Sequence, residues 1–378
     1  MDVLVVAGEA SGDQHAADAV AALKRLRPEL RFFGMGGPRL AAQGVELIHG
    51  AHEISVMGIV EVLPKVPRIW QVLRDLERAA RERSPAVALL IDVPDFNLRL
   101  AKKLKALEIP IAYYVAPMAW AWRESRTRTI AERVDHLLCI LPFEEEFFRT
   151  RGVHATYVGN PVLDQLPAPG SAADYRRALG LDVEGPVFAV LPGSRRSEIS
   201  RLGPTLAAVS SRVIALRPGT RVVVPVAPGL TRELVEAPFL AAGVKPTLID
   251  GRAAQVVGAC DVALVASGTA TLEAGLMRRP LVSVYRVNAL SYAVGKLLVR
   301  TPFFCLVNLL VGKKVVPELL QGDLTVERVI AALEPLWSGP AREECLAGLD
   351  QLREKLGPGG ASQRVAEEVL KLVAIHQG

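Results

Sequence analysis

The feature that most limits how this chain can fold is an alternation of short apolar runs with amphipathic, helix-length segments. In the first half the apolar runs are VLVVA, RFFGM, VALLID, IAYYVA and HLLCIL, which start at residues 3, 31, 87, 111 and 136. Strands that are separated by helices pair in parallel through right-handed crossover connections. The first half is therefore predicted to form an open, parallel α/β sheet.

The alternation stops and then starts again, which predicts two domains. Residues 165–186 read QLPAPGSAADYRRALGLDVEGP, a segment rich in Pro, Gly and Ala that is typical of a linker. The runs VFAVLPGS, RVVVPVA, TLID, DVALVASG and LVSVY follow, and a length of 378 residues also favours two cores. We predict Rossmann-like domains at 1–165 and 185–355, and a helix at 356–378 that packs back on a neighbouring domain or subunit.

Composition and charge exclude several classes of function. The net charge of +5 suits an anionic substrate or a membrane surface, and it is too small to indicate nucleic-acid binding. The four cysteines and six histidines show no metal-ligand spacing, so we expect a reducing cytoplasm and no metal. No secretory signal pattern opens the chain, and the apolar region from Leu290 is broken by charged residues, so no membrane crossing is expected.

Neither half contains the G-x-G-x-x-G dinucleotide fingerprint or the P-loop pattern, so no dinucleotide cofactor is expected. Two α/β domains of similar size that face a central cleft are the architecture of GT-B glycosyltransferases and their epimerase relatives. In that architecture the sugar nucleotide lies on the C-terminal half. The fold class predicted here is therefore α/β with GT-B organisation.

Two strand ends in the C-terminal half carry small and polar residues that suit an anion. In LPGSRRSE, the residues Gly193, Ser194 and Arg195 offer backbone N–H groups and a guanidinium to a phosphate at a helix N-terminus. A plain helix cap explains this motif equally well, with Ser194 or Ser197 as the cap and Glu198 completing a capping box.

The second such strand end is VASGTATLEAG. Here Ser267, Gly268 and Thr269 admit a diphosphate, and Glu273 is placed to accept hydrogen bonds from ribose hydroxyls. The alternative is again a cap, at Thr269, with Glu273 on a solvated face. Because two strand ends of this kind occur in the C-terminal half, we favour a nucleotide site.

The N-terminal half has two strand ends of its own that carry acidic residues. GEASGD, with Glu9, Ser11, Gly12 and Asp13, is predicted to form a tight turn before a helix. In LLIDVPDFN, Asp92 follows a hydrophobic strand, where partial burial disfavours its charge and suits it to act as a general base. The alternative for Asp92 is a structural hydrogen bond to a neighbouring loop.

Two further segments leave the choice between function and packing open. WAWR places Trp122 and Arg123 together, which suits a sugar face and a phosphate or a core with a basic rim. The apolar stripe from Val56, with Lys65, Arg68 and Arg74, is typical of a segment that touches anionic lipid, or of a core helix with a charged outer side.

The motifs GEASGD, VMGIVEVLP, IDVPDFNLRLAKKLK, WAWR, LPFEEEFF, LPGSRRSEI, ASGTATLE and NLLVGKKVVPELLQ follow one another as far as about residue 321. In content and order they resemble the lipid-A-disaccharide synthase family of GT-B enzymes. The resemblance implies a metal-independent, inverting transfer between UDP-2,3-diacylglucosamine and 2,3-diacylglucosamine 1-phosphate (lipid X), with UDP as the second product. It also implies peripheral contact with the cytoplasmic face of the inner membrane, and we expect a homodimer.

Carried onto this sequence, the resemblance makes Asp92 the general base for the 6-hydroxyl of the acceptor. It assigns the UDP-sugar to Gly193, Ser194, Arg195, Ser267, Gly268, Thr269, Glu273, Asn308 and Gln321, and the acceptor to Glu9, Ser11, Gly12, Asp13, Trp122 and Arg123. The nearest alternatives are a peptidoglycan N-acetylglucosaminyltransferase and a UDP-N-acetylglucosamine 2-epimerase. A non-catalytic protein that binds a sugar nucleotide would have no need of Asp92.

Overall fold

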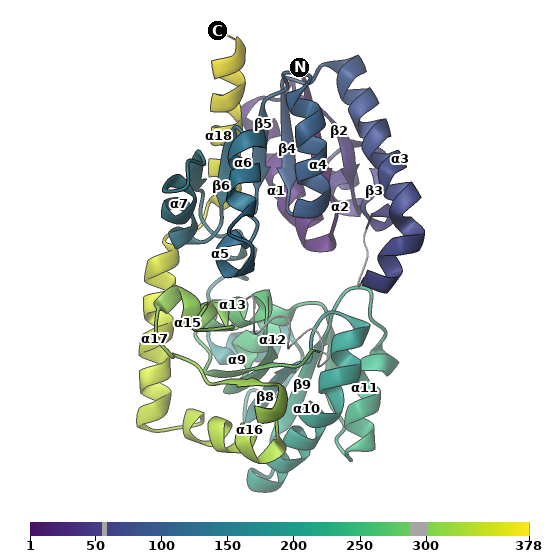
Figure 1. The fold of residues 1–378 in the computed structure, drawn as a ribbon. Helices are drawn as coiled ribbons and strands as arrows, with labels where there is room; N and C mark the ends of the chain where they lie inside the picture. The colour runs from purple at the N-terminus through teal and green to yellow at the C-terminus, as the bar shows by residue number, and fades with distance from the viewer. Residues whose placement is uncertain (55–58, 288–300, 378) are drawn as a thin grey trace. The chain divides into compact units, whose positions relative to one another are not determined.

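The computed structural model describes residues 1–54, 59–287 and 301–377, which fold as two compact units. The first unit is Met1–Asp164 together with Pro358–Gly378, and the second is Gln165–Gly357 (Figure 1). Each unit has a parallel sheet with helices on it, so the predicted fold class of two Rossmann-like α/β domains is confirmed.

The first unit is built on a sheet of seven parallel strands among the described residues, in the order β3-β2-β1-β4-β5-β6-β7. The strands are β1 (Asp2–Ala7), β2 (Arg31–Gly36), β3 (Glu46–Gly50), β4 (Val87–Ile91), β5 (Ile111–Tyr114), β6 (His136–Cys139) and β7 (Ala155–Tyr157). The central strands are buried on both faces, which explains why their sequences are continuous apolar runs.

Helices cover both faces of this sheet. The helices are α1 (Ala10–Leu26), α2 (Pro38–Ala42), α3 (Ile59–Arg83), α4 (Pro94–Lys105), α5 (Ala119–Trp122), α6 (Arg126–Arg133), α7 (Pro142–Arg149), α8 (Val162–Gln165) and α18 (Ala361–Gln377), with the 3-10 turn η1 (Ala51–Glu53). One core joins the sheet to α1 and α18, and the other joins it to α3, α4, α6 and α7. The C-terminal helix thus packs against α1, at the opposite end of the sequence.

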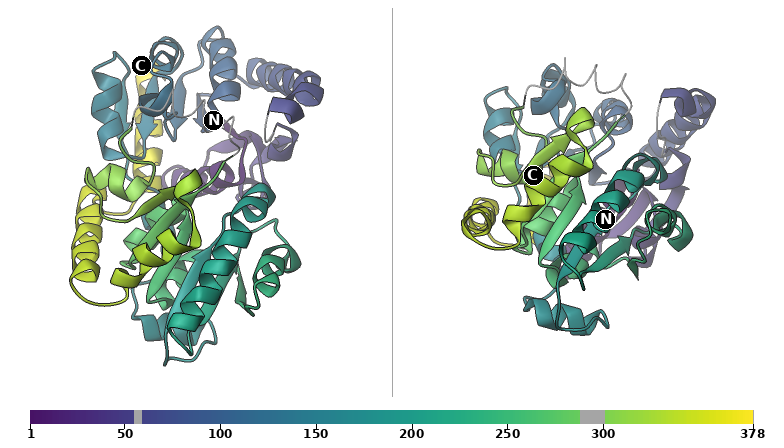
Figure 2. Two further views of the ribbon diagram at one scale, coloured as in Figure 1. Left: turned by 60° about the horizontal axis from the view of Figure 1, so that its bottom comes forward. Right: turned by 90° about the horizontal axis from the view of Figure 1, so that it is seen from below.

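The second unit has a sheet of six parallel strands among the described residues, in the order β10-β9-β8-β11-β12-β13. They are β8 (Val187–Leu191), β9 (Arg221–Val226), β10 (Thr247–Asp250), β11 (Val262–Ala266), β12 (Leu281–Tyr285) and β13 (Glu318–Leu320). The helices are α9 (Ala172–Ala178), α10 (Arg196–Leu216), α11 (Arg232–Ala241), α12 (Ala253–Ala259), α13 (Thr269–Leu276), α15 (Leu306–Val311), α16 (Val326–Leu333) and α17 (Pro340–Leu356), with η2 (Gln321–Asp323) and η3 (Glu334–Leu336) (Figure 2).

The segment predicted to be a linker is instead part of the second unit. Its helix α9 packs against α12, and the side chains of Tyr175 and Arg176 are buried. The Arg176 guanidinium donates to the C=O of Ala259 (2.9 Å) and pairs with Asp261 (3.0 Å). Its Pro and Gly content suggested a linker, but the few buried contacts of this helix attach it to the sheet.

Two regions of interest in the sequence fall partly outside the described residues. They are the start of the apolar stripe at Val56 and residues 290–300, the first part of the apolar region from Leu290. Within the three described ranges, no helix combines the length and the apolar character that crossing a membrane requires.

Candidate active site

The candidate site in the first unit lies where β1 and β4 end side by side. These strands pair in register, with Ala7 opposite Ile91. The sheet then continues through β2 on one side and β5 on the other, so this pair is the topological switch point. Ligands of open α/β sheets bind at the carboxyl ends of the strands at such a point. Glu9 and Asp92 follow these two strand ends, and the Glu9 carboxylate is near enough to raise the pKa of Asp92.

The backbone at Asp92 has an uncommon conformation that neighbouring groups hold in place. Both Asp92 and Val93 have positive φ angles, of 51° and 43°, which cost about 1–3 kcal/mol each in residues other than glycine. The N–H of Asp92 donates to the C=O of Tyr114 (3.0 Å). Its C=O accepts from the Tyr113 hydroxyl (2.5 Å) and from the Asn97 amide (2.8 Å). These bonds fix the turn through the backbone and leave the carboxyl of Asp92 for other uses.

Burial raises the pKa of the Asp92 carboxyl, the charge of Glu9 raises it further, and a hydrogen bond from the N–H of Val93 lowers it. The net change is an increase, which makes the carboxylate a stronger proton acceptor. This is the property that a general base toward a hydroxyl needs.

Sequence reasoning missed the two side chains that support this turn. Asn97 is fully buried, and its amide also donates to the C=O of Ile91 (3.0 Å). Tyr113 lies in the middle of β5, where the apolar run gave no reason to separate it from its neighbours. The motif DVPDFN contains Asn97, so its position after a strand was the one available signal.

The GEASGD segment divides into exposed and buried residues. Helix α1 begins at Ala10, inside the GEASGD segment that was predicted to be a turn, and Glu9 and Ser11 are exposed. Asp13 is 3% exposed, and its carboxylate accepts from the N–H groups of Gly37 (2.7 Å), Arg39 and Leu40 at the start of α2. Asp13 is thus the cap of a neighbouring helix.

Gly37 is needed for packing in this region, because a Cβ there would lie 2.6 Å from Oδ2 of Asp13. Gly12 is buried in α1, where a Cβ would make ordinary contacts with Ile91 (3.6 Å) and Ala7 (3.7 Å). In the expected acceptor set, Glu9 and Ser11 therefore have exposed side chains, while Gly12 and Asp13 are buried.

The next strand along, β5, leads to Trp122 and Arg123 at the end of α5. The Arg123 guanidinium lies 4.5 Å from the centre of the Trp122 ring, and that of Arg126 lies 5.8 Å from it. Asp95 pairs with Arg126 (2.6 Å) and more distantly with Arg123 (3.7 Å). Trp122 and Arg123 remain exposed, so the structure gives a stacked, cationic surface at this edge.

Glu144 is a buried carboxyl that ties α5 to the start of α7. It is 1% exposed and accepts from Nε1 of Trp120 (3.0 Å) and from the N–H groups of Ile140 (3.2 Å) and Leu141 (3.0 Å). Burial raises the pKa of Glu144 to about 7, although these hydrogen bonds lower it. The contact anchors the segment that carries Trp122, and no sequence spacing signals it.

The second unit has its own switch point, between β8 and β11. These strands pair in register, with Leu191 opposite Val265, and β9 and β12 lie on their outer sides. The loop that contains Gly193 and Arg195 follows β8, and the loop that contains Ser267 follows β11. The two predicted anion loops are therefore neighbours at one sheet edge.

A side chain of the chain itself fills the first of these loops. Oε2 of Glu198 accepts from the N–H groups of Ser194 (2.8 Å) and Arg195 (3.2 Å), and the Arg195 guanidinium lies 3.3 Å from Oε1. Gly193 has φ +115°, and a Cβ there would lie 2.3 Å from Oε2. Glu198 completes a capping box as the alternative expected, but the N-cap is Arg195, so the expectation that Ser194 or Ser197 is the cap is wrong. The position of the Glu198 carboxylate shows where the N–H groups of this loop bind an anionic oxygen.

The second loop opens α13. Gly268 is the N-cap, with φ 151° and no side-chain cap, so the alternative that made Thr269 the cap is wrong. The Thr271 hydroxyl donates to the C=O of Gly268 (2.7 Å). Glu273 is partly buried, and this burial raises the pKa of its carboxyl, so the alternative of a solvated face does not describe it well. Ser267 and Thr269 flank the cap.

Asn308 and Gln321 are both held by the chain. Asn308 is fully buried, and its amide makes four hydrogen bonds: it accepts from the N–H groups of Val315 and Val316 and donates to the C=O of Val316 and to Glu318. Gln321 follows β13 with φ 50°. With the O and N of its side-chain amide exchanged, the amide pairs with the backbone N–H and C=O of Val287, 3.2 Å each. These contacts give Asn308 the geometry of a residue that holds the 308–318 loop.

The chain was compared with known proteins. The lipid-A-disaccharide synthetase family model matches residues 3–357. The lipid-A-disaccharide synthase of Myxococcus xanthus (strain DK1622) is 58% identical over 372 residues, which cover 98% of this chain and 97% of that one. The lipid-A-disaccharide synthase of Anaeromyxobacter sp. (strain K) is 53% identical over 371 residues, which cover 97% and 96%.

Solved structures share the fold at low identity. UDP-GlcNAc 2-epimerase from Neisseria meningitidis, bound to UDP-GlcNAc, has a TM-score of 0.67 at 13% identity, over 98% of this chain and 100% of that one. MurG of Acinetobacter baumannii has a TM-score of 0.60 at 12% identity, over 98% and 99%. These likenesses concern the fold alone and agree with the GT-B prediction.

Proposed function

Because the chain belongs to the lipid-A-disaccharide synthetase family, we propose that it joins UDP-2,3-diacylglucosamine to 2,3-diacylglucosamine 1-phosphate. The products are a β-1,6-linked disaccharide 1-phosphate and UDP. The observation that carries this proposal is the position of Asp92 at the switch point of the first sheet, with a pKa raised by burial. Its carboxyl lies where open α/β sheets place ligand contacts.

In the proposed reaction Asp92 takes the proton of the acceptor 6-hydroxyl. The hydroxyl oxygen forms a bond to the anomeric carbon of the donor, and the bond from that carbon to the UDP oxygen breaks. Attack from the face opposite UDP inverts the configuration. The exposed side chains of Glu9 and Ser11, with Trp122 and Arg123 at the neighbouring strand end, are proposed to bind the acceptor.

The second unit is proposed to bind the donor and stabilise the leaving group. The N–H groups of Ser194 and Arg195 already hold a carboxylate, and a diphosphate oxygen carries the same charge on a similar oxygen. Ser267, Gly268 and Thr269 form the adjacent loop, and Glu273 is proposed to accept from the ribose hydroxyls. These donors oppose the charge that develops on UDP, so the proposed mechanism does not call for a metal.

The test is a direct product assay. Purified protein is incubated with both substrates in the presence of a chelator, and UDP and disaccharide are followed by mass spectrometry. We expect the disaccharide and UDP in equal amounts. A second reaction with UDP-N-acetylglucosamine alone is expected to give no epimer. Bound UDP without any disaccharide would contradict the proposed transfer, and epimer formation would favour the epimerase alternative.

We propose that the protein is cytoplasmic and works on the cytoplasmic face of the inner membrane, because both substrates carry acyl chains. Helix α3 supports this: Trp70 is 43% exposed, and Arg68 and Arg74 are exposed on the same helix. The start of the apolar stripe, including Val56, lies outside the described residues, and the side chain of Lys65 is not described. We also propose a homodimer, which the molar mass in solution tests.

The membrane proposal predicts that Arg68→Gln with Arg74→Gln lowers binding to vesicles of phosphatidylglycerol about thirty-fold, since each cation near an anionic surface contributes about 1 kcal/mol. Flotation of protein with vesicles measures the bound fraction. Lys245→Gln with Arg212→Gln, exposed positions in the second unit, removes the same charge as a control. Equal flotation of both variants and the parent would rule out this contact.

A further inference from the structure

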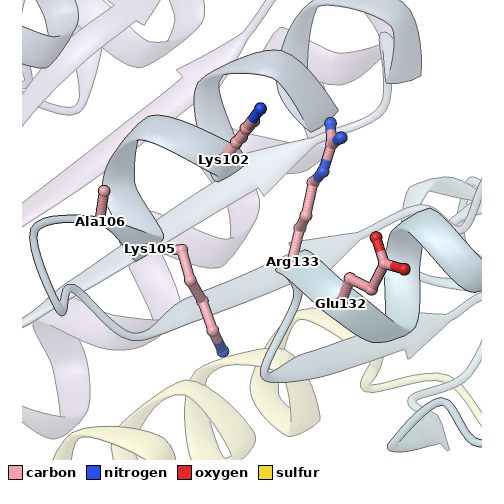
Figure 3. A pocket seen from close by; sticks show the side chains of 5 residues that line it. All are labelled: Lys102, Lys105, Ala106, Glu132 and Arg133. Atoms are coloured by element: carbon pink, nitrogen blue, oxygen red, sulfur yellow. The ribbon is translucent and has the colours of Figure 1, made fainter.

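The first unit has a pocket that the proposed reaction does not use. It has a volume of about 390 Å³ and is lined by Lys102, Lys105, Ala106, Glu132 and Arg133, from the last turns of α4 and α6 (Figure 3). Helix α4 starts beside Asp92 and is 12 residues long, so these last turns lie about 15–18 Å from that strand end. The pocket is therefore separate from the candidate active site.

The charges around this pocket do not balance. Glu132 pairs with Arg128 (3.2 Å) and Lys105 pairs with Asp135 (2.5 Å). Arg133 donates one N–H to the C=O of Leu98 (2.9 Å), which is a neutral partner.

The remaining cation of the pocket lining is Lys102. Across the ranges that the structure describes, no carboxylate pairs with Lys102 or with Arg133. Two cations of this lining, from two different helices, thus have no ion-pair partner in the described part of the chain.

The two cations, Lys102 and Arg133, extend in the same direction. Figure 3 shows the Lys102 ammonium and the Arg133 guanidinium reaching the same side of the pocket, while Lys105 extends to the other side. Cations in the last turn of a helix are common, because they complement the helix dipole. The helix dipole explains why each cation lies in the last turn of its helix. It does not require the side chains of two helices to extend to the same side of one pocket. An anion between them would remove their repulsion.

We propose that this pocket binds a phosphate ester, with its phosphate between Lys102 and Arg133. A guanidinium beside an ammonium offers a fork of N–H donors and a point charge, the usual partners of a phosphate group. The volume is at the lower end of the range for small-molecule sites, so a larger group than a bare ion fits. Glu132, a hydrogen-bond acceptor in the lining, suits a hydroxyl group on the ester. A glycerophosphate unit, free in solution or as a lipid headgroup, has this chemistry.

The test uses the full-length protein saturated with UDP, which keeps the probe out of the proposed donor site. Calorimetry measures the binding of sn-glycerol 3-phosphate, and flotation measures binding to vesicles of phosphatidylglycerol. The variants are Lys102→Gln, which breaks no described contact, and Lys102→Gln with Arg133→Gln. The Lys245→Gln and Arg212→Gln double variant is the charge-matched control.

We expect the double variant to weaken binding of at least one probe about ten-fold or more, since a charge-assisted hydrogen bond is lost at each position. Lys102→Gln alone is expected to show part of this loss, and the control none. Loss with the soluble probe identifies a free phosphate ester, and loss with vesicles alone identifies a lipid headgroup. Parent, control and variants that bind both probes equally would overturn the proposal, as would a parent that binds neither.

Discussion

Replacing Asp92 with Asn is expected to lower kcat for disaccharide formation about a thousand-fold, while the affinity for UDP stays unchanged. Asparagine keeps the size of the side chain but cannot take a proton, and general-base catalysis contributes about 10²- to 10⁴-fold. The turn should survive the change, because the N–H and C=O of residue 92 make the anchoring bonds to Tyr114, Tyr113 and Asn97. The measurements are steady-state kinetics with both substrates and UDP calorimetry.

The pH dependence of the reaction rate, measured for the parent and for Asp92→Asn, gives an independent check of the role of Asp92 as base. The base must be ionised, and burial together with Glu9 raises the pKa of Asp92 above its ordinary 3.8. The parent rate should therefore fall as the pH drops through this raised pKa, and the Asp92→Asn variant has no such group to titrate. Glu9→Gln should move the fall of the parent rate to lower pH, because it removes the neighbouring negative charge.

Asp95→Asn is the matched control for Asp92→Asn. It makes the same chemical change three residues further on, at a carboxylate that is 77% exposed and that pairs with Arg126, whose side chain is 11% exposed. We expect its kcat to stay within about three-fold of the parent, because the proposed reaction moves no proton to Asp95 and this carboxylate is in solvent. Activity retained by Asp92→Asn, or lost equally in both variants, would contradict the role of Asp92 as base.

The sequence pattern predicted the central strands of both sheets and the strand ends that carry polar residues, but it missed the edge strands β3, β7 and β13. It could not show that β1 lies beside β4, or β8 beside β11, because alternation defines strands without fixing their order. That order is what makes neighbours of Glu9 and Asp92, and of the Arg195 and Ser267 loops. The candidate sites were thus predictable as separate motifs, and their assembly at switch points came from the fold.

The sequence also could not show which hydrogen bonds individual polar side chains make. Asp13 and Asn308 were grouped with ligand contacts, but each satisfies buried backbone groups elsewhere in its unit. The same holds for Glu144, whose bond to Trp120 joins two segments that are 24 residues apart. A motif shows which residues are neighbours in the sequence. Only the folded structure shows which partners their side chains contact.

Arg195 gives the second prediction, because its charge is proposed to oppose the charge on departing UDP. Arg195→Ala is expected to lower kcat about 10²- to 10³-fold, the loss found when one preorganised donor is removed from a developing anion. UDP affinity should fall much less, since the N–H groups of Ser194 and residue 195 remain in place to hold a phosphate oxygen. Arg195→Lys should recover part of kcat, because it restores the charge without the guanidinium fork.

The neighbouring arginine makes this experiment decisive. Arg196 is exposed and is the first residue of α10, so Arg196→Ala removes the same charge one residue away. If the net charge of the loop were what mattered, both alanine variants would lose activity equally. If Arg195 acts on the transition state, its loss appears in kcat and not in UDP binding. Loss of UDP affinity with kcat unchanged for Arg195→Ala would instead assign Arg195 to ground-state binding of the nucleotide.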